Sequence, residues 1–237
     1  MKELIEALKK LDIEDPEQKA EKMIAYVDRI LEANEHVNLT AITDREEAIR
    51  KHLIDSLSCA EAAGGHKCVP KTAVDIGTGG GFPGVPLAIA LPETEFTLID
   101  SVEKKLRIVD EICRDLGIDN VEVCHGRAED LAREEDHRDY YDLCVSRAVA
   151  NMQTLCELCL PFVKKGGRFI AYKGPECVEE VKSAAKAMEA LEGKLQAIMP
   201  QPRAEGMEGH SLVIIDKTGV TDPRYPRKAG IPSKKPL

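Results

Sequence analysis

A glycine-rich stretch next to an acidic residue is the part of the sequence best suited to hold a ligand. Four of the five residues from Gly77 to Gly81 are glycine, and Asp75 lies just before them. Glycine lets a chain turn tightly and brings bare backbone against a ligand. The run from Gly79 to Gly84 also fits the G-x-G-x-x-G pattern, which can seat a dinucleotide pyrophosphate on the N-terminus of a helix. The stretch therefore indicates a ligand of nucleotide type, with an ordinary turn between a strand and a helix as the alternative.

The same residues also fit a second class of ligand. Read from Asp75, they form Asp-x-Gly-x-Gly-x-Gly through Gly77, Gly79 and Gly81, which resembles the first motif of the S-adenosylmethionine-dependent methyltransferases. That ligand has no phosphate, so the glycines would allow close approach to its methionine part. Asp100 ends the next predicted strand, where a carboxylate can accept hydrogen bonds from both ribose hydroxyls. The loop and the acid together favour a ligand that contains adenosine.

The elements that must position these residues alternate between strands and helices. Residues 72–76 form a short apolar run rich in β-branched residues, and Pro83 follows the glycines where a helix can begin without an N–H donor. A strand, a glycine turn and a helix open a doubly wound α/β sheet. The last two predicted strands have no helix between them, which indicates an antiparallel pair. We predict a mostly parallel seven-stranded sheet with an antiparallel last strand, its strands covering residues 72–76, 96–100, 121–124, 141–145, 168–172, 195–199 and 211–215.

Three parts are expected along the chain. Residues 1–66 form an N-terminal helical extension, in which His52 and Asp55 lie three apart on one helix and can share a polar contact. We interpret that pair as structural. Residues 67–218 form the α/β domain, in which Ser101 is expected to cap a helix and residues 175–191 to form a single helix. Residues 219–237 form a basic, proline-rich tail packed on or beside the domain.

Composition limits the class of protein. No apolar run reaches membrane-spanning length, and the N-terminus lacks the apolar region of a signal peptide, so we expect a cytoplasmic protein without a membrane partner. The eight cysteines are scattered, and we interpret them as reduced thiols. The one C-x-x-C pair, Cys156 and Cys159, lies in an apolar helical stretch without a second pair at zinc spacing, so no metal site is predicted.

Charge is distributed unevenly along the chain. The net charge is −9, and residues 221–237 hold five cations and one acid, so the tail carries +4 and the remainder −13. Because proline restricts the chain and lacks an N–H donor, we expect the tail to run extended without a helix and to follow an RNA backbone. The alternatives are a solubilising end and a strap whose Tyr225 packs on the body. The predicted RNA contacts are Arg224, Arg227 and Lys228 in the tail and Lys173 at the end of the fifth strand, with a solvent-facing position as the alternative for Lys173.

Taken in order, these and further motifs make the chain resemble the small-subunit rRNA methyltransferase G family, also called glucose-inhibited division protein B. The resemblance runs nearly from end to end, and its specificity comes from the order and spacing of motifs that are weak one by one. The motifs are Asn38-Leu39-Thr40, His52-Leu53-x-Asp55-Ser56-Leu57, the glycine-rich stretch Asp75 to Gly84, Asp100-Ser101 with Lys104-Lys105, Arg127-Ala128-Glu129, Ser146-Arg147-Ala148, Lys173-Gly174 and Arg224-Tyr225-Pro226-Arg227-Lys228-x-Gly230-x-Pro232.

The resemblance implies a Rossmann-like class I methyltransferase that moves a methyl group from S-adenosylmethionine to N7 of guanosine 527 in 16S rRNA. Guanine N7 carries a free lone pair, so no general base has to remove a proton from it. Such an enzyme instead needs to align N7 with the methyl carbon and the sulfur and to exclude water. The sequence agrees, because it lacks the Asn/Asp-Pro-Pro-Tyr/Phe motif that serves exocyclic amines and a Pro-Cys nucleophile suited to pyrimidine rings.

The same resemblance implies roles for individual residues. Arg147 would lie beside cofactor and RNA and is the candidate catalytic residue, with a structural cation at the strand end as the alternative. Asp75 would either brace the glycine loop or touch the ligand. The other implied cofactor contacts are Gly77 and Phe82 at the methionine part, Gly79 and Gly81 in the loop between them, Asp100 and Ser101 at the ribose, and Ala128 and Glu129 at the adenine edge.

Two other classes of protein stay open at this point. An NAD-dependent oxidoreductase would share the glycine loop and Asp100, but it would carry a catalytic Tyr-Lys pair or histidine in a second region, which is not evident. A non-enzymatic RNA-binding or assembly factor would not need a ribose acid and adenine-edge residues together. For the methyltransferase, we expect a monomer that acts on 16S rRNA within the small ribosomal subunit or an assembly intermediate, with naked rRNA as the other possible substrate.

Overall fold

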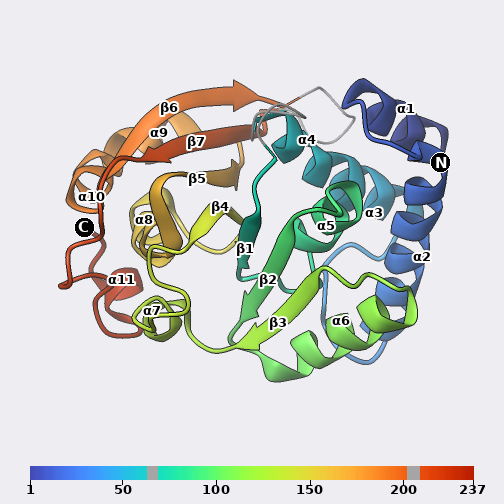
Figure 1. Ribbon diagram of the computed structural model, residues 1–237, viewed down its shortest axis with the longest axis horizontal. Helices are drawn as coiled ribbons and strands as arrows, with labels where there is room; N and C mark the ends of the chain where they lie inside the picture. The colour runs from blue at the N-terminus through green and yellow to red at the C-terminus, as the bar shows by residue number, and fades with distance from the viewer. Residues whose placement is uncertain (63–68, 202–208) are drawn as a thin grey trace.

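One seven-stranded sheet forms the centre of the molecule in the computed structural model, which describes residues 1–62, 69–201 and 209–237 (Figure 1). The strand order is β3-β2-β1-β4-β5-β7-β6. The first five strands pair in parallel, and β7 runs antiparallel to both of its neighbours. The predicted fold class is therefore confirmed. The strands are β1 (Thr72–Ile76), β2 (Glu95–Asp100), β3 (Val121–His125), β4 (Tyr141–Arg147), β5 (Val163–Lys173), β6 (Gly193–Pro200) and β7 (Ser211–Lys217).

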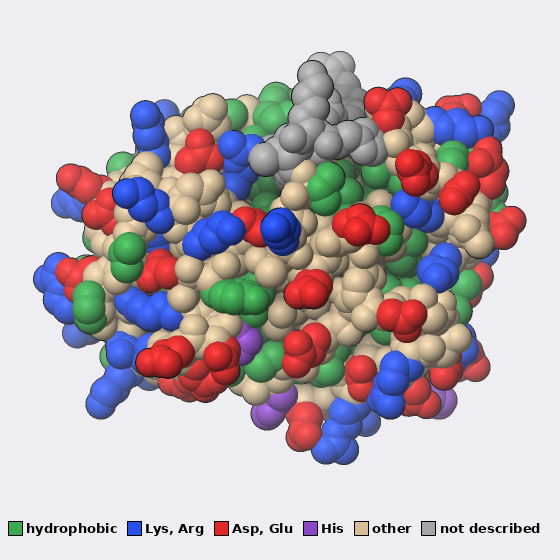
Figure 2. Space-filling view, in the orientation of Figure 1, with side chains coloured by type: hydrophobic (Ala, Val, Ile, Leu, Met, Phe, Trp, Pro, Cys, Tyr) green, Lys and Arg blue, Asp and Glu red, His purple; other side chains and the backbone are tan. Residues whose placement is uncertain are grey.

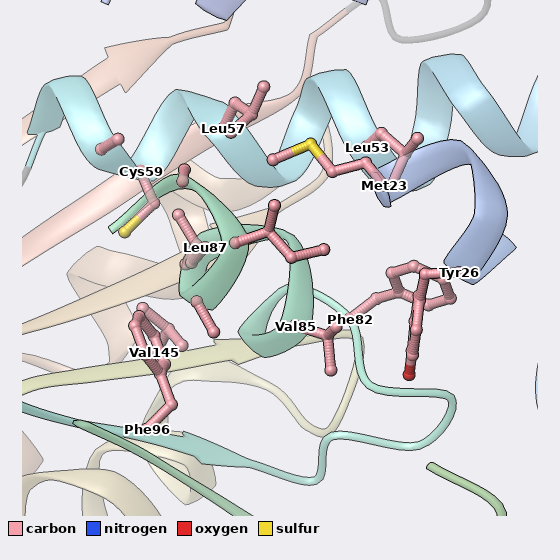
Figure 3. Close-up of a cluster of buried hydrophobic side chains, with 14 of the residues drawn as sticks. Met23, Tyr26, Leu53, Leu57, Cys59, Phe82, Val85, Leu87, Phe96 and Val145 are labelled. Atoms are coloured by element: carbon pink, nitrogen blue, oxygen red, sulfur yellow. The ribbon is translucent and has the colours of Figure 1, made fainter. Parts of the chain in front are cut away.

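The N-terminal helices share a hydrophobic core with one face of this sheet. Buried side chains of α2 (Pro16–Asn34) and of the segment after it pack against α5 (Gly84–Ala90), and Figure 3 shows Met23, Leu53 and Leu57 facing Val85 and Leu87. The extension is thus part of the core beside the glycine loop. The predicted boundary between residues 66 and 67 lies outside the described residues. The other helical elements on this side are α1 (Lys2–Lys10), α3 (Arg45–Ala48), a π-helical turn (Ile49–Ile54), α4 (Asp55–Ala62) and α6 (Glu103–Asp115).

The second core lies on the opposite face of the sheet. It includes Val74 and Cys144 from the central strands and apolar residues of the following helices. Asn151 caps the first of these helices, because its side chain accepts a hydrogen bond from the Thr154 amide at 3.0 Å. The single helix predicted for residues 175–191 is wrong, since two helices meet at Ala184. The elements here are α7 (Ala128–Leu131), α8 (Met152–Cys159), a 3₁₀ turn (Leu160–Phe162), α9 (Cys177–Ser183) and α10 (Ala185–Ala190).

The tail is a strap on this second face, and it ends far from the N-terminal helices (Figure 1). Tyr225 packs against the second core, as the alternative of a strap predicts. The expectation of a tail without helix is wrong, because α11 (Ile231–Lys234) forms one turn. Pro232 lies in the first turn of this helix, where its missing N–H costs no hydrogen bond. Within the described ranges, none of the helices is both long and apolar enough to span a membrane.

Candidate functional site

The glycine loop leaves the carboxyl end of β1 in a conformation that requires glycine. Gly77, Gly79 and Gly81 have φ angles of 74°, 58° and 83°, in the left-handed region that other residues avoid. The amides of Gly77 and Thr78 donate to the carbonyl oxygen of Ile99 at 2.9 and 3.1 Å. These bonds tie the loop to the end of β2. The two predicted ligand-binding stretches therefore meet at one edge of the sheet.

Asp75 braces the loop from inside. Its side chain is fully buried, and Oδ2 accepts hydrogen bonds from the Thr78 hydroxyl at 2.8 Å and the Gly84 amide at 2.9 Å. Burial raises the pKa of Asp75 to about 6, although these two hydrogen bonds and the charge of Arg147 oppose the rise. Oδ1 is the one buried side-chain polar atom without a hydrogen-bond partner among the described residues. Of the two roles expected for Asp75, the observed contacts are those of the brace.

Asp100 joins the end of β2 to the glycine loop. Oδ2 accepts a hydrogen bond from the Gly79 amide at 2.9 Å, and Oδ1 accepts one from the Val102 amide at 2.8 Å. Ser101 is exposed beside it. The expectation that Ser101 caps the following helix is wrong, because Val102 occupies the N-cap position and Asp100 supplies the carboxylate that accepts its N–H. Asp100 thus lies where a ribose beside Gly79 would meet it.

Because Gly81 has no side chain, Tyr26 and Val85 can pack directly against its backbone. A Cβ atom at this position would overlap the hydroxyl oxygen of Tyr26 and approach Val85 to 2.9 Å. A side chain at position 81 would therefore meet the N-terminal extension, and contact of Gly81 with the cofactor stays a prediction. Tyr26 is fully buried on α2, and its hydroxyl donates a hydrogen bond to the Gly80 carbonyl at 2.9 Å. Sequence reasoning missed Tyr26, whose only signal is a hydroxyl on the apolar stripe of a helix.

Gly77 makes similar room for the segment after β4. A Cβ atom on Gly77 would overlap the side chain of Val149. The neighbouring Ala148 has a φ of 57°, which is uncommon for a residue with a side chain and is typical of strained backbone at functional sites. The segment that leaves β4 therefore covers the loop at the position expected to border the methionine part.

Ala128 and Glu129 open α7 at the end of β3, on the same edge of the sheet. Glu129 is 6% exposed, and its Oε1 accepts a hydrogen bond from the Gly230 amide of the tail at 2.8 Å. The side chain of Glu129 therefore anchors the tail. Contact of this pair of residues with an adenine stays a prediction.

Arg147 ends β4 and points into the N-terminal extension. Its Nη1 donates to Asp55 Oδ2 at 2.8 Å and to the Lys51 carbonyl at 3.0 Å, and its Nη2 lies 3.2 Å from His52 Nδ1. The side chain of Arg147 is 14% exposed and that of Asp55 is 6% exposed. His52 and Asp55 thus both contact Arg147, which agrees with the structural role predicted for this pair. Nothing in the spacing of the sequence indicated that Arg147 is this partner.

His52 is held as a neutral ring in a single tautomer. Arg147 can only donate, so Nδ1 accepts, and Nε2 carries the proton toward Thr40 Oγ1 at 2.7 Å. Burial and the charge of Arg147 lower the pKa of His52 to about 3. Phe82 stacks on the ring, with 4.3 Å between centroids and 10° between planes. Phe82, predicted at the methionine part, thus has its ring packed between His52 and Tyr26.

Two of the predicted RNA contacts are used inside the protein. Lys173 Nζ forms an ion pair with Glu180 at 2.6 Å and donates to the Ala150 carbonyl at 3.0 Å, with 10% of its side chain exposed. Arg227 donates to both carboxylate oxygens of the fully buried Glu157, at 2.6 to 3.1 Å. Both cations thus have carboxylate partners within the protein, and their contact with RNA stays a prediction. A strand-end or tail position does not reveal a partner that comes from another helix.

The other two tail cations lie on the surface. Lys228 is exposed, and the side chain of Arg224 is 78% exposed in spite of its ion pair with Asp222 at 2.8 Å. An exposed pair of this kind contributes little to stability and exchanges easily for another anion. Arg224 and Lys228 therefore remain available for RNA.

A groove at the amino ends of β2, β3 and β4 is unsuited to RNA. It encloses about 720 Å³, and its lining includes five carboxylates. On the face of the molecule drawn in Figure 2, acidic and basic side chains are interspersed. Phosphates would be repelled in the groove. The amino edge of the sheet is therefore unfavourable for a polyanion. The carboxylates of the groove belong to Glu95, Asp119, Glu122, Glu135 and Asp136.

The carboxyl edge fits a ligand that contains adenosine. Among the described residues, a Cβ atom on Gly79 would find only the Leu39 carbonyl oxygen within 4 Å, at 3.8 Å, so this part of the loop faces open space. Each oxygen of Asp100 accepts one backbone N–H and keeps a further lone pair for a ribose hydroxyl. The described residues hold no cluster of His, Cys, Asp and Glu that could bind a metal ion.

Comparison with known proteins points to one family. Residues 19–205 match the family model described as rRNA small subunit methyltransferase G. The ribosomal RNA small subunit methyltransferase G of Clostridium novyi (strain NT) is 45% identical over 231 residues, which cover 98% of this chain and 94% of that protein. The protein of the same name from Clostridium perfringens (strain 13 / Type A) is 46% identical over 222 residues, covering 93% and 92%.

Solved structures with a similar fold include methyltransferases of several kinds. The O-methyltransferase TomG from Streptomyces achromogenes, in complex with SAM, has a TM-score of 0.55 and 16% identity, with 82% of this chain and 90% of that chain covered. The ribosomal protein L11 methylase from Lactobacillus delbrueckii subsp. bulgaricus has a TM-score of 0.53 and 14% identity, with 71% and 79% covered. At these identities the likeness concerns the fold.

Proposed function

The chain belongs to the rRNA small subunit methyltransferase G family, and from this premise we propose that it transfers a methyl group from S-adenosylmethionine to N7 of guanosine 527 in 16S rRNA. The observation that carries the cofactor assignment is the contact between Gly79 and Asp100 at the carboxyl edge of the sheet, beside open space. An oxidoreductase and a non-enzymatic assembly factor are set aside, because the family is one of methyltransferases.

The protein's part in this reaction is to bind, orient and keep water out. When bound, S-adenosylmethionine supplies an electrophilic methyl group on a sulfonium. Asp100 and Gly79 would hold the adenosine end, and the segment that carries Val149 borders the loop at Gly77. Alignment of N7 with the methyl group then supplies most of the rate enhancement, because no proton has to leave N7 before it attacks.

Arg147 acts in this scheme as a positioning residue. A hydrogen bond to N7 would occupy the lone pair that must attack. The guanidinium of Arg147 is instead held by three hydrogen bonds inside the protein, from its Nη1 and Nη2 to Asp55, the Lys51 carbonyl and His52. It fixes the end of β4, and with it the strained Ala148, against the N-terminal extension.

The substrate is proposed to be rRNA in the small subunit or in an assembly intermediate, methylated in the cytoplasm by a monomer. Arg224 and Lys228 are the tail cations assigned first to RNA phosphates, because they are exposed, whereas Arg227 and Lys173 pair with the carboxylates of Glu157 and Glu180. The acidic groove at the amino edge faces away from the RNA in this arrangement.

The experiment that tests the proposal is methyl transfer from labelled S-adenosylmethionine to small subunits, assembly intermediates and naked 16S rRNA that lack the modification. Reduction with borohydride and cleavage with aniline detect 7-methylguanosine, and primer extension locates it. We expect one stop that corresponds to guanosine 527, with Asp100→Ala as the control that loses cofactor affinity. Label at another atom or another nucleotide would refute the assignment.

A further inference from the structure

Glu129 keeps one carboxylate oxygen open to a ligand, although its side chain is almost enclosed. The residue is 6% exposed, and Oε1 accepts a hydrogen bond from the Gly230 amide at 2.8 Å. Oε2 has no hydrogen-bond partner among the described residues, and it is not sealed off from solvent. An ionised carboxylate only accepts hydrogen bonds, so a group that binds at Oε2 has to donate one. The amino group on the edge of an adenine is such a donor.

The segment that leads to Glu129 starts beside Asp100. β2 and β3 pair in parallel, and Asp100 is in register with His125 at the carboxyl edge of the sheet. The Gly126 amide donates a hydrogen bond to the carbonyl oxygen of Asp100 at 3.1 Å. A ribose held by the carboxylate of Asp100 would therefore have its base next to the short segment from Gly126 to Glu129.

The donor that holds Glu129 belongs to the C-terminal strap, residues 219–237. Gly230 directly precedes α11 and has a φ of 79°, in the left-handed region. This turn directs the Gly230 amide to Glu129 and brings α11 next to α7 (Figure 1). The strap thus fixes one oxygen of the carboxylate, and the direction of the other oxygen follows from it.

The strap is itself held by residues outside this site. Arg227 pairs with the buried Glu157 at 2.6 Å, and its backbone amide donates to the same carboxylate at 2.7 Å. The guanidinium of Arg138 donates at 2.9 to 3.1 Å to three carbonyl oxygens of the strap, those of Thr221, Asp222 and Tyr225. These contacts determine where Gly230 lies, and through it how the carboxylate of Glu129 is oriented.

We infer that the C-terminal strap positions Glu129 for the cofactor, with the Gly230 amide holding Oε1 so that Oε2 accepts a hydrogen bond from the amino group of the adenine; this inference rests on the function proposed above. Gly230 is a positioning residue, because it acts through Glu129. A carboxylate released by the strap would be free to rotate, and the cofactor would have to order it on binding. That ordering would cost affinity.

Gly230→Ala tests the strap, and Gly166→Ala is its matched control. Both glycines have left-handed backbones, with φ of 79° and 85°, and a Cβ atom on either meets nothing within 4 Å among the described residues. Each variant thus adds the same methyl group and similar backbone strain without a clash. Turning residue 230 relieves this strain and withdraws its amide from Glu129, whereas Gly166 is exposed near the start of β5.

Calorimetric titration with S-adenosylhomocysteine measures the affinity, and thermal unfolding measures the stability. We expect Gly230→Ala to lose about tenfold in affinity and Gly166→Ala to stay within about twofold of wild type, with similar shifts in unfolding temperature. Glu129→Ala should lose affinity as well. Gly230→Ala should cause no further loss in that background, because the group that it positions is gone. In the wild-type protein, bound S-adenosylhomocysteine should slow hydrogen exchange of the Gly230 amide by about tenfold, because the coupling is reciprocal.

Several results would overturn the role of the strap while the cofactor assignment stands. Wild-type affinity in Gly230→Ala, or exchange of the Gly230 amide that bound S-adenosylhomocysteine does not slow, would do so directly. An equal loss of affinity in Gly166→Ala would assign the effect to backbone strain in general. A tenfold loss that persists in the Glu129→Ala background would show that the strap does not act through Glu129. Wild-type protein that binds no S-adenosylhomocysteine would overturn the cofactor assignment, and this inference with it.

Discussion

The hydroxyl of Tyr26 donates a hydrogen bond to the carbonyl oxygen of Gly80 at 2.9 Å, across 54 residues of sequence. A helix of the N-terminal extension thus holds the middle of the glycine loop. The bond is fully buried, and the Tyr26 ring also meets Phe82 edge to face at 5.7 Å. The extension is therefore part of the cofactor loop's support.

The first prediction concerns this bond. Tyr26→Phe removes the hydroxyl and leaves the Gly80 carbonyl without that donor in a buried place, so the free energy of unfolding should fall by about 1–3 kcal/mol. Affinity for S-adenosylhomocysteine should fall as well, because the loop loses its fixed position. Denaturant unfolding and calorimetry measure the two effects. Tyr140→Phe, at a tyrosine that is 49% exposed, is the control, and wild-type affinity in Tyr26→Phe would contradict the role of Tyr26.

The second prediction couples Tyr26 to Gly81. Gly81→Ala places a methyl group against the Tyr26 hydroxyl and forces alanine into a left-handed conformation, so it should cost more than the roughly 1–2 kcal/mol of that conformation alone. In the Tyr26→Phe background the overlapping oxygen is gone. The double mutant should therefore be more stable than the sum of the single effects by about 0.5–3 kcal/mol, which a double-mutant cycle measures. Strict additivity would show that the methyl group points elsewhere.

The glycine loop shows what the sequence could and could not predict. Its position after β1 and the acid that ends β2 follow from short local patterns, and both were placed correctly. The use of Gly81 did not follow, because its neighbour Tyr26 is distant in the sequence and their approach depends on how α2 packs. Position in the sequence predicts where backbone must bend and does not say which side chain fills the space.

The partners of buried ion pairs could not be predicted from the sequence either. Lys173 and Arg227 sit at positions where a cation would suit RNA, and each is bound by a carboxylate of a helix, Glu180 and Glu157. The sequence contains these acids, but their pairing is decided by tertiary packing. Arg147 could be placed at the edge of the site because it ends a strand, whereas its partner Asp55 belongs to a separate part of the chain.

The third prediction concerns that partner. Asp55→Ala leaves the guanidinium of Arg147 largely buried without its counter-ion, which should lower the free energy of unfolding by about 3–5 kcal/mol. Arg147→Ala should lower turnover more than it lowers S-adenosylhomocysteine affinity, because Arg147 positions the acceptor side of the site. Arg147→Lys keeps the charge but loses the fork of donors, so it should not restore turnover. If turnover and affinity fall in parallel, Arg147 serves the cofactor instead.

The fourth prediction concerns Asp75 and pH. The pKa of Asp75 is about 6 in the folded protein and its ordinary value is 3.8, so between these pH values the folded state holds a proton that the unfolded chain has released. Stability should therefore fall as pH rises through this window and level off above about pH 6. Two pKa units correspond to about 3 kcal/mol at most. Asp75→Asn keeps an oxygen for Thr78 and Gly84 and removes the titration.

The comparison of wild type with Asp75→Asn isolates this effect. His52 acts in the opposite direction, because its lowered pKa makes stability fall as pH drops below about 6.5, but it is present in both proteins. Arg147 and Asp100, the other charges that act on Asp75, are also unchanged. The stability difference, measured by urea unfolding without cofactor, should grow in favour of Asp75→Asn from about pH 4 to about pH 6 and then stay constant. A difference independent of pH would show that Asp75 is ionised throughout.

The fifth prediction separates the two kinds of cation in the tail. Arg227→Ala leaves Glu157 fully buried without its partner, so it should destabilise the fold by about 3–5 kcal/mol and loosen the strap. Arg224→Ala and Lys228→Ala touch only exposed side chains, and each should change stability by less than about 0.5 kcal/mol.

RNA binding should show the reverse pattern. If Arg224 and Lys228 neutralise phosphates, the double variant Arg224→Ala with Lys228→Ala should reduce the slope of log affinity against log salt by about 0.7–0.9 for each phosphate that is left unneutralised, while affinity for S-adenosylhomocysteine stays constant. Lys10→Ala is the matched control, since Lys10 is an exposed cation on the first helix, in the extension and away from the tail. An unchanged slope in the double variant would assign the tail to the support of the fold alone, because a segment tied down by Glu157 and Glu129 needs no RNA to be ordered.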